Sequence, residues 1–306
     1  MTAYILRRLG YSVFVLWGAL TIVFVIVRVV PGDPAQLIAG PQASKEDVAV
    51  LRRRLGLDRA LPVQYVTYLG QVARLDLGAS LRLNQPAVAA VADRFKATAT
   101  LAFTAMLIGG LLSFPLGIVA ALRPRSVIDA LVSVFSLLGQ SVPNFWLGLM
   151  FILLFARRLR WFPSAGIGGW KHLVLPALTL ALPLVGILTR LIRTGLLEVL
   201  GEEYIRTAQA KGLTPRAVIV RHALRNMFIP VVTVAGLQLG QLLGGAVIVE
   251  TVFGWPGAGQ LLVQAISNRD YPVVQAGVLF ITGGFILINL LVDVSYGYLD
   301  PRIRYR

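Results

Sequence analysis

Long apolar runs alternate with polar and charged segments along most of the chain. At 1.5 Å of rise per residue, runs of this length suffice for helices that cross about 30 Å of hydrocarbon. Within the last five runs, Asp129 is the one charged residue. The pattern predicts an all-α, polytopic integral membrane protein with six transmembrane helices, at Leu9–Val27, Ala97–Leu122, Asp129–Ala156, Leu173–Thr189, Phe228–Val249 and Tyr271–Val292.

The first apolar run lies where a signal peptide would lie, but it lacks the cleavage site of a signal peptide. Arg7 and Arg8 precede it, and no small-residue cleavage site follows. We therefore expect a retained helix within residues 1–30, ended by the prolines of Pro31–Pro34. Residues 31–96 are then expected to form an extracytoplasmic segment, and residues 97–306 a core domain with the other five spans.

Composition agrees with this membrane interpretation and excludes an ordinary soluble domain. Of 306 residues, 57% are hydrophobic and 14% are charged, and the mean hydropathy is +0.75. The net charge of +15 does not indicate nucleic-acid binding, because the basic residues are spread among the segments between apolar runs. The chain has no cysteine, which excludes a disulfide, a thiolate metal site and a cysteine nucleophile.

Basic residues also predict the orientation of the chain in the membrane. The segments on one side hold most of the arginines, including Arg302, Arg304 and Arg306, whereas the short loops on the other side hold few. Because arginine and lysine are enriched on the cytoplasmic side, both termini and residues 198–230 are predicted to be cytoplasmic.

Residues 198–230 are the longest densely charged interruption between the later apolar runs, and their punctuation predicts a helical hairpin. A first helix is expected from Glu202 to Lys211, with acidic residues in its first turn and a lysine in its last. Gly212 suits the left-handed position after a helix. Thr214 and Pro215 suit the N-cap and first position of a second short helix.

The second helix of this hairpin is predicted to be amphipathic. Its apolar stripe consists of Ala217, Val220, Leu224 and Phe228. Its polar side consists of Arg221, His222, Arg225 and Asn226. A charged hairpin between membrane spans favours contact with another protein over a role as a solvated connector.

This segment resembles the cytoplasmic loop of permease subunits from binding-protein-dependent ABC importers, in their dipeptide, oligopeptide, glutathione and nickel branch. The loop pattern in that family is Glu-Ala-Ala, three residues, Gly and a distal Pro. Arg206, Thr207 and Ala208 stand at the first three positions, Gly212 at the glycine and Pro230 at the proline. The last alanine and the glycine agree, and TAQAKG and RHALRN are similar to the peptide branch. Further similar stretches are VPGDPAQLIAG (30–40), LGLD (55–58), DLGAS (76–80), VETVFGWPGAGQLL (249–262), RDYPVVQAG (269–277) and DPRIRYR (300–306).

The resemblance implies the type I permease fold of ABC importers and a function in uptake across the cytoplasmic membrane. It implies a second homologous permease subunit, two ATP-binding subunits that hold ATP and Mg²⁺, and an extracytoplasmic substrate-binding protein, with membrane lipid around the permease spans. The implied substrates are dipeptides, oligopeptides or glutathione, with nickel complexes as the alternative. The residues expected to couple to the ATPase are Glu203, Arg206, Thr207, Ala208, Gly212, Arg221, His222, Arg225, Asn226 and Pro230.

Several residues inside the spans suggest helix contacts or a path. Pro115, Pro143, Pro176 and Pro183 are expected to kink their helices. Gly236, Gly240 and Gly244 form a small-xxx-small face that lets another helix, such as one of a second subunit, approach closely. Five amide side chains could either form hydrogen bonds between helices or line a translocation path: Gln140, Asn144, Gln238, Gln241 and Asn289.

Two carboxylates lie at span ends, Glu250 at an outer end and Asp293 near an inner one. Their cost in hydrocarbon calls for partners or water, which favours structural anchoring or gating over proton carriage. Proton carriage would belong to the main rival interpretation, an autonomous ion-coupled carrier. A membrane enzyme is the third interpretation.

The sequence contains no chemistry of its own for energy supply or catalysis. No Walker loop, H-E-x-x-H or G-x-S-x-G motif occurs, so we expect no cofactor in this chain and no enzymatic activity. His172 and His222 fall on opposite sides in the predicted topology, which excludes a metal site between them. The GWPGAG stretch at Gly254–Gly259 lacks a lysine and is interpreted as a tight extracytoplasmic turn.

Overall fold

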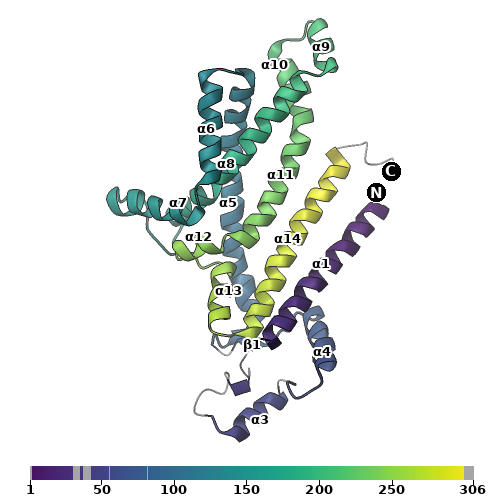
Figure 1. Ribbon diagram of the computed structural model, residues 1–306, viewed down its shortest axis with the longest axis vertical. Coiled ribbons are helices and arrows are strands. Elements are labelled where there is room, and N and C mark those ends of the chain that lie inside the picture. Colours follow the sequence, from purple (N-terminus) through teal and green to yellow (C-terminus); the bar gives the residue numbers. More distant parts are fainter. Residues whose placement is uncertain (1, 30–34, 37–42, 55, 81, 300–306) are drawn as a thin grey trace.

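The computed structural model describes residues 2–29, 35–36, 43–54, 56–80 and 82–299. The predicted stop at Pro31–Pro34 and the arginines at 302, 304 and 306 lie outside these residues. Strands β1 (Ala79–Ser80) and β2 (Gln85–Pro86) form a short antiparallel ladder, in which Ser80 pairs with Gln85. The long helices follow the long axis of the molecule (Figure 1): α1 (Thr2–Val29), α5 (Ala87–Leu122), α6 (Val127–Ser141), α8 (Trp170–Leu200), α11 (Leu224–Gly245) and α14 (Tyr271–Leu299).

The described residues contain five helices long and apolar enough to cross a membrane, and a bent pair that makes a sixth if it counts as one span. The bent pair is Val127–Ser141 with Asn144–Arg158, at an angle of 102°. The kink expected at Pro143 within the predicted span Asp129–Ala156 is confirmed, but it is a sharp break between two helices, and the number of apolar segments agrees with the prediction.

Backbone chemistry at Val142 and Pro143 explains this bend. Val142 is extended, with φ of −82° and ψ of 125°, because the residue before a proline is disfavoured in the helical region. Pro143 is also extended and starts α7 (Asn144–Phe151), which continues into a π-helix, η1 (Ile152–Arg158). Two extended residues break the helix, whereas Pro115, Pro176 and Pro183 lie inside continuous helices.

Helix bounds differ from the predicted spans because the predictions follow the apolar runs, whereas the helices continue into the charged residues beside them. The α5 helix begins at Ala87, inside the segment predicted to be extramembranous, and α8 runs past Thr189 to Leu200. The remaining helices are shorter: α3 (Lys45–Arg54), α4 (Leu61–Ala73), α9 (Glu203–Ala210), α10 (Pro215–Ala217), η2 (Val218–Ala223), α12 (Val247–Val252) and α13 (Ala258–Ser267).

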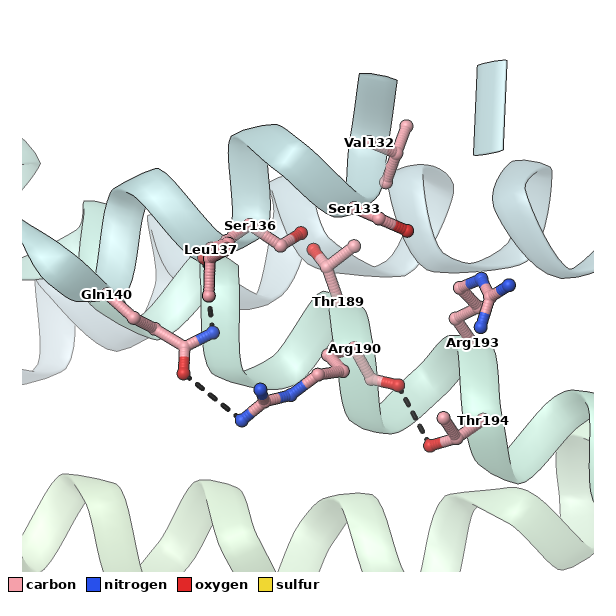
Figure 2. A pocket seen from close by; sticks show the side chains of 9 residues that line it. All are labelled: Val132, Ser133, Ser136, Leu137, Gln140, Thr189, Arg190, Arg193 and Thr194. Carbon is pink, nitrogen blue, oxygen red and sulfur yellow. Dashed lines mark hydrogen bonds between the residues drawn. The ribbon is translucent and has the colours of Figure 1, made fainter. Parts of the chain in front are cut away.

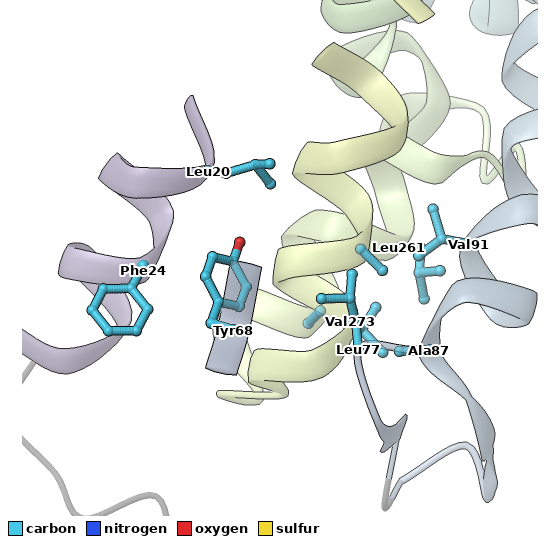
Figure 3. Packing of buried hydrophobic residues seen from close by; sticks show 10 residues of the cluster. Leu20, Phe24, Tyr68, Leu77, Ala87, Val91, Leu261 and Val273 are labelled. Atoms are coloured by element: carbon cyan, nitrogen blue, oxygen red, sulfur yellow. The ribbon is translucent and has the colours of Figure 1, made fainter. Parts of the chain in front are cut away.

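The segment before α5 packs onto the membrane helices rather than forming a domain of its own. Tyr68 of α4 is 3% exposed and packs against Phe24 of α1 with tilted rings, whose centroids are 5.5 Å apart. Leu77 belongs to the same cluster, together with Leu261 of α13 and Val273 of α14 (Figure 3). The α3 and α4 helices thus lie at one end of the molecule, and α9 and α10 lie at the other (Figure 1).

The α8 helix is the central element of the core. Leu180 on one half of α8 packs with Leu101 of α5 and Phe253 in one cluster. Ile192 on its other half packs with Ile205 of α9 and Met227 of α11 in a second cluster. The core therefore connects the membrane helices directly to the helices at the α9 end.

Candidate functional site

Gly212 makes the turn of the predicted coupling hairpin, residues 198–230. Its φ is +77°, in the left-handed region that favours glycine. Its N–H donates to the Gln209 carbonyl at 2.9 Å, and the Leu213 N–H donates to the Ala208 carbonyl at 3.3 Å. The predicted first helix, Glu202–Lys211, and its terminating glycine are confirmed to within one residue, since α9 spans Glu203–Ala210.

The second helix of the hairpin begins as predicted but does not end before the next apolar run. The Thr214 hydroxyl accepts a hydrogen bond from the Ala217 N–H at 3.4 Å, and Pro215 is the first helical residue. α10, η2 and α11 then follow one another without a break to Gly245. The expectation of a second short helix is therefore wrong. Pro230 lies inside α11 and does not end the hairpin helix.

The predicted apolar stripe of that helix is wrong at two of its four positions, and the other two, Ala217 and Leu224, are half-buried. Val220 and Phe228 are exposed, at 55% and 42%, whereas the buried positions are Val218, Ala223 and Met227. A π-helix bonds residue i to i+5, so the buried face advances by five residues across η2 instead of three or four. The hairpin packs on α8 through this shifted face.

Polar contacts fix the hairpin and leave several charges outside. The Asn226 amide donates to the Tyr204 hydroxyl at 2.7 Å and so links α11 to α9. Glu203 and Arg206 form an exposed ion pair at 2.9 Å. Arg221 and Arg225 are exposed and His222 is half-buried on the second helix.

Two small members of the predicted coupling set serve the packing of α9. The Thr207 hydroxyl donates to the Glu203 carbonyl at 3.0 Å, within the helix. Ala208 is 6% exposed and lies in the cluster shared with α8 and α11. The outward surface of α9 is therefore formed by its longer polar side chains.

The five predicted path amides fall into two groups. Gln140 and Asn144 flank the bend between α6 and α7. Gln238 and Gln241 lie on α11 and Asn289 on α14, where the buried Asn289 Oδ1 has no partner among the described residues. The structure does not bring all five amides to one place.

The small-residue face of α11 packs against α14 of the same chain. A Cβ placed on Gly236 would lie 2.0 Å from Val292 Cγ2, and one on Gly240 would lie 3.1 Å from Phe285 Cδ2. Close helix approach at this face is confirmed. The helix that approaches this face is α14 of the same chain.

A polar cavity of about 260 Å³ lies between α6 and α8 (Figure 2). Asp129, in the first turn of α6, accepts hydrogen bonds from Nε and Nη2 of Arg193, the latter at 2.8 Å. Arg190 Nη2 donates to Gln140 Oε1 at 3.2 Å. Polar residues that line the cavity are Ser133, Ser136, Gln140, Thr189, Arg190, Arg193 and Thr194.

The sequence interpretation missed this cavity, although a signal for part of it was present. Asp129 is the one charged residue within the later apolar runs, and a charge there calls for a partner on another helix. Arg190 and Arg193 lie just after the next run, where either could supply that partner. The residues around Ser136 and Thr189 in the sequence do not indicate that the two hydroxyls lie between α6 and α8.

Glu250 is fully buried beside Thr98 of α5. Its carboxylate accepts hydrogen bonds from the Thr98 hydroxyl at 2.5 Å and from the Gln260 N–H at 2.8 Å. Burial raises the pKa of Glu250, because desolvation of the charged form outweighs these hydrogen bonds. A Cβ on Gly257 would lie 2.1 Å from Glu250 Oε1, so the predicted turn at Gly254–Gly259 wraps around this carboxylate.

Asp293 is paired on the opposite part of the molecule. Its Oδ2 lies 3.0 Å from Nη1 of Arg8, and the Asp293 side chain is 14% exposed. This ion pair joins α14 to α1, the first and last long helices of the chain. Both span-end carboxylates thus contact another helix.

Comparisons with known proteins agree with this architecture. Residues 113–305 match the family described as "Binding-protein-dependent transport system inner membrane component", and residues 1–102 match the family model for the N-terminal part of such membrane components. The glutathione transport system permease protein GsiC of Salmonella typhimurium is 43% identical over 306 residues, which cover 100% of both chains. A probable peptide ABC transporter permease protein of Sinorhizobium fredii is 41% identical over 313 residues, again with 100% of both chains covered.

Solved structures show the same fold at low sequence identity. An inward-facing MetNI methionine ABC transporter aligns with a TM-score of 0.52 and 20% identity, over 70% of this chain and 94% of that one. An amino acid ABC transporter solved with histidines aligns with a TM-score of 0.52 and 15% identity, over 77% and 98%. The predicted all-α, polytopic type I permease fold is confirmed, and the chain belongs to the family of binding-protein-dependent transport system inner membrane components, a permease component of ABC importers and not an enzyme.

Proposed function

We propose that this chain is a pore-forming permease subunit that imports peptides, with glutathione as a leading candidate. Permeases of this family work with ATP-binding and substrate-binding subunits. The observation that carries the substrate class is the end-to-end match to permeases named for glutathione and for peptides, at 43% and 41% identity. A nickel complex remains the alternative substrate.

The proposed assembly contains a second homologous permease, two ATP-binding subunits and an extracytoplasmic binding protein. Both termini and the hairpin at residues 198–230 face the cytoplasm, and residues 31–96 face the other side. The position of the hairpin and of α3 and α4 at opposite ends of the molecule supports this orientation (Figure 1). The exposed residues of α9 and of the helix after Gly212 then meet the ATP-binding subunits.

The connection of the hairpin to the spans supports its role in coupling. α8 ends at Leu200, two residues before α9, and the helix from Pro215 runs unbroken into the membrane. The buried Ile205 and Met227 belong to the same cluster as Ile192 of α8. A displacement of the hairpin by ATP-driven closure would therefore move α8 and α11 directly.

The two span-end carboxylates support anchoring over ion coupling. Glu250 joins α12 to α5 through Thr98, and Asp293 joins α14 to Arg8 of α1. An ion-coupled carrier needs a carboxylate that exchanges with water during each cycle. Two carboxylates that are held by other helices fit an anchoring role better.

The decisive experiment combines substrate identification with reconstitution. The binding protein should gain thermal stability with glutathione or another peptide, since a ligand that prefers the native state stabilises it. Proteoliposomes with the complete importer should take up the same ligand in an ATP-dependent manner, and the lone chain should transport nothing. Uptake by the lone chain, or uptake lost when an ion gradient is dissipated with ATP intact, would refute the proposal. Stabilisation by nickel complexes alone would reassign the substrate.

A further inference from the structure

The cavity between α6 and α8 contains buried hydroxyl groups that have no hydrogen-bond partner. Ser136 is 3% exposed and Thr189 is 1% exposed, and neither hydroxyl oxygen is bonded to any described residue. In Figure 2 both hydroxyls point into the space between the two helices. A buried hydroxyl without a hydrogen-bond partner destabilises the folded protein. Native proteins therefore contain one mainly where a ligand or water supplies the missing hydrogen bond.

The same cavity has one positive charge that no acidic side chain balances. Arg193 is neutralised by Asp129, which it contacts through two nitrogens. Arg190 donates to the neutral amide of Gln140, and no carboxylate of the described residues pairs with it. A guanidinium carries five N–H donors, so Arg190 retains donors for a further acceptor.

The direction of Arg190 argues against a role as an ordinary membrane-end arginine. A long cation at the inner end of a span normally extends outward to the headgroups and water. Arg193 does extend toward the start of α6, where it meets Asp129. Arg190 instead reaches Gln140, eleven positions along α6 and therefore about 16 Å farther from that end.

We infer that this cavity binds a carboxylate group of the transported peptide on its route through the membrane. The carboxylate would accept hydrogen bonds from the Arg190 guanidinium and from the hydroxyls of Ser136 and Thr189, while Gln140 orients the arginine. The volume of about 260 Å³ suits one end of a peptide rather than a whole ligand of drug size. This inference rests on the proposed function and adds a residue-level recognition site to it.

The test measures binding to the complete, detergent-solubilised importer without its binding protein and without nucleotide. Alanyl-alanine should raise the thermal midpoint, and alanyl-alanine amide, which lacks the carboxylate, should raise it much less. Arg190→Gln should weaken alanyl-alanine binding by about tenfold or more, as expected for a lost charge-assisted hydrogen bond. Arg190→Lys should retain part of the affinity, because lysine keeps the charge but loses the fork geometry.

Ser136→Ala and Thr189→Val separate a ligand role from a structural one. Each removes a hydroxyl that has no partner in the protein, so the midpoint without ligand should stay equal or rise. Affinity for alanyl-alanine should fall about three- to tenfold in each variant. Lys171→Gln, an exposed charge change at the other end of α8, is the matched control and should leave binding unchanged.

Uptake by proteoliposomes that include the binding protein distinguishes the failure of this inference from that of the proposed function. Normal ATP-driven peptide uptake with no midpoint shift, or with equal shifts for alanyl-alanine and its amide, would overturn the cavity assignment alone. Equal stabilisation by inorganic phosphate would also overturn it, in favour of a general anion site. Absence of peptide uptake in the wild-type importer would overturn the proposed function itself.

Discussion

Replacement of Gly212 by valine should perturb the hairpin backbone without a steric clash, because an added Cβ meets no atom within 4 Å. The φ of +77° places the residue in the left-handed region, where a β-branched side chain costs roughly 1–2 kcal/mol. At 1.4 kcal/mol per factor of ten, this lowers the population of the docking-competent turn about five- to thirtyfold. Gly212→Asn is the graded control, because asparagine enters this region more readily than other non-glycine residues.

The assay is ligand-stimulated ATP hydrolysis and uptake by the reconstituted importer, at matched membrane abundance. Both activities should fall together, strongly in Gly212→Val and weakly in Gly212→Asn. Arg221→Glu reverses an exposed charge without a change in the turn, and its smaller loss should depend on salt, since exposed ion pairs are weak and screened. Normal coupling in Gly212→Val and Arg221→Glu would show that the hairpin is only a connector.

Three further predictions follow from the fold. Single cysteines in this cysteine-free chain test topology: an impermeant reagent should label positions 43 and 267 in intact cells but positions 125 and 209 only after lysis, and the reverse pattern would overturn the orientation. Gly236→Ala places a Cβ 2.0 Å from Val292 Cγ2 and should cost about 1–3 kcal/mol of stability, whereas Gly245→Ala in the same helix meets nothing within 4 Å; equal thermal midpoints would contradict the packing. Glu250→Gln presents an NH₂ group to a pocket of donors and should cost about 1–3 kcal/mol. Because the pKa of Glu250 is raised in the folded protein, wild-type stability falls as pH rises through that pKa. The stability difference between wild type and Glu250→Gln should therefore shrink at higher pH. A difference that grows with pH in thermal scans would refute the assignment.

The features that could be predicted from sequence are those that depend on local backbone chemistry. Gly212 has the positive φ that a turn after a helix requires, and Thr214 caps the next helix through its own hydroxyl. The apolar runs also located the membrane helices, because a span needs an uninterrupted apolar surface in the lipid. None of these features depends on contacts between distant parts of the chain.

The features that could not be predicted depend on hydrogen-bond register or on packing over long sequence distances. The π-helix at Val218–Ala223 moves the buried face of the hairpin, and periodicity of 3.6 residues cannot reveal such a shift. Pro143 indicated a kink, but the 102° bend requires Val142 to be extended as well. Arg190 and Gln140 are 50 residues apart, so their contact appears only when α6 and α8 are packed together.

The Asp129–Arg193 ion pair relates the hairpin to the cavity. Asp129 also accepts the Arg125 N–H at 3.0 Å, which fixes the carboxylate relative to the start of α6. Arg193 lies between Arg190 of the cavity and Leu200, where α8 ends before the hairpin. Because the pair joins α6 to α8 within this stretch, a displacement of the hairpin should carry both walls of the cavity together. Release of a bound carboxylate would then depend on what faces the cavity after the movement, rather than on separation of α6 from α8.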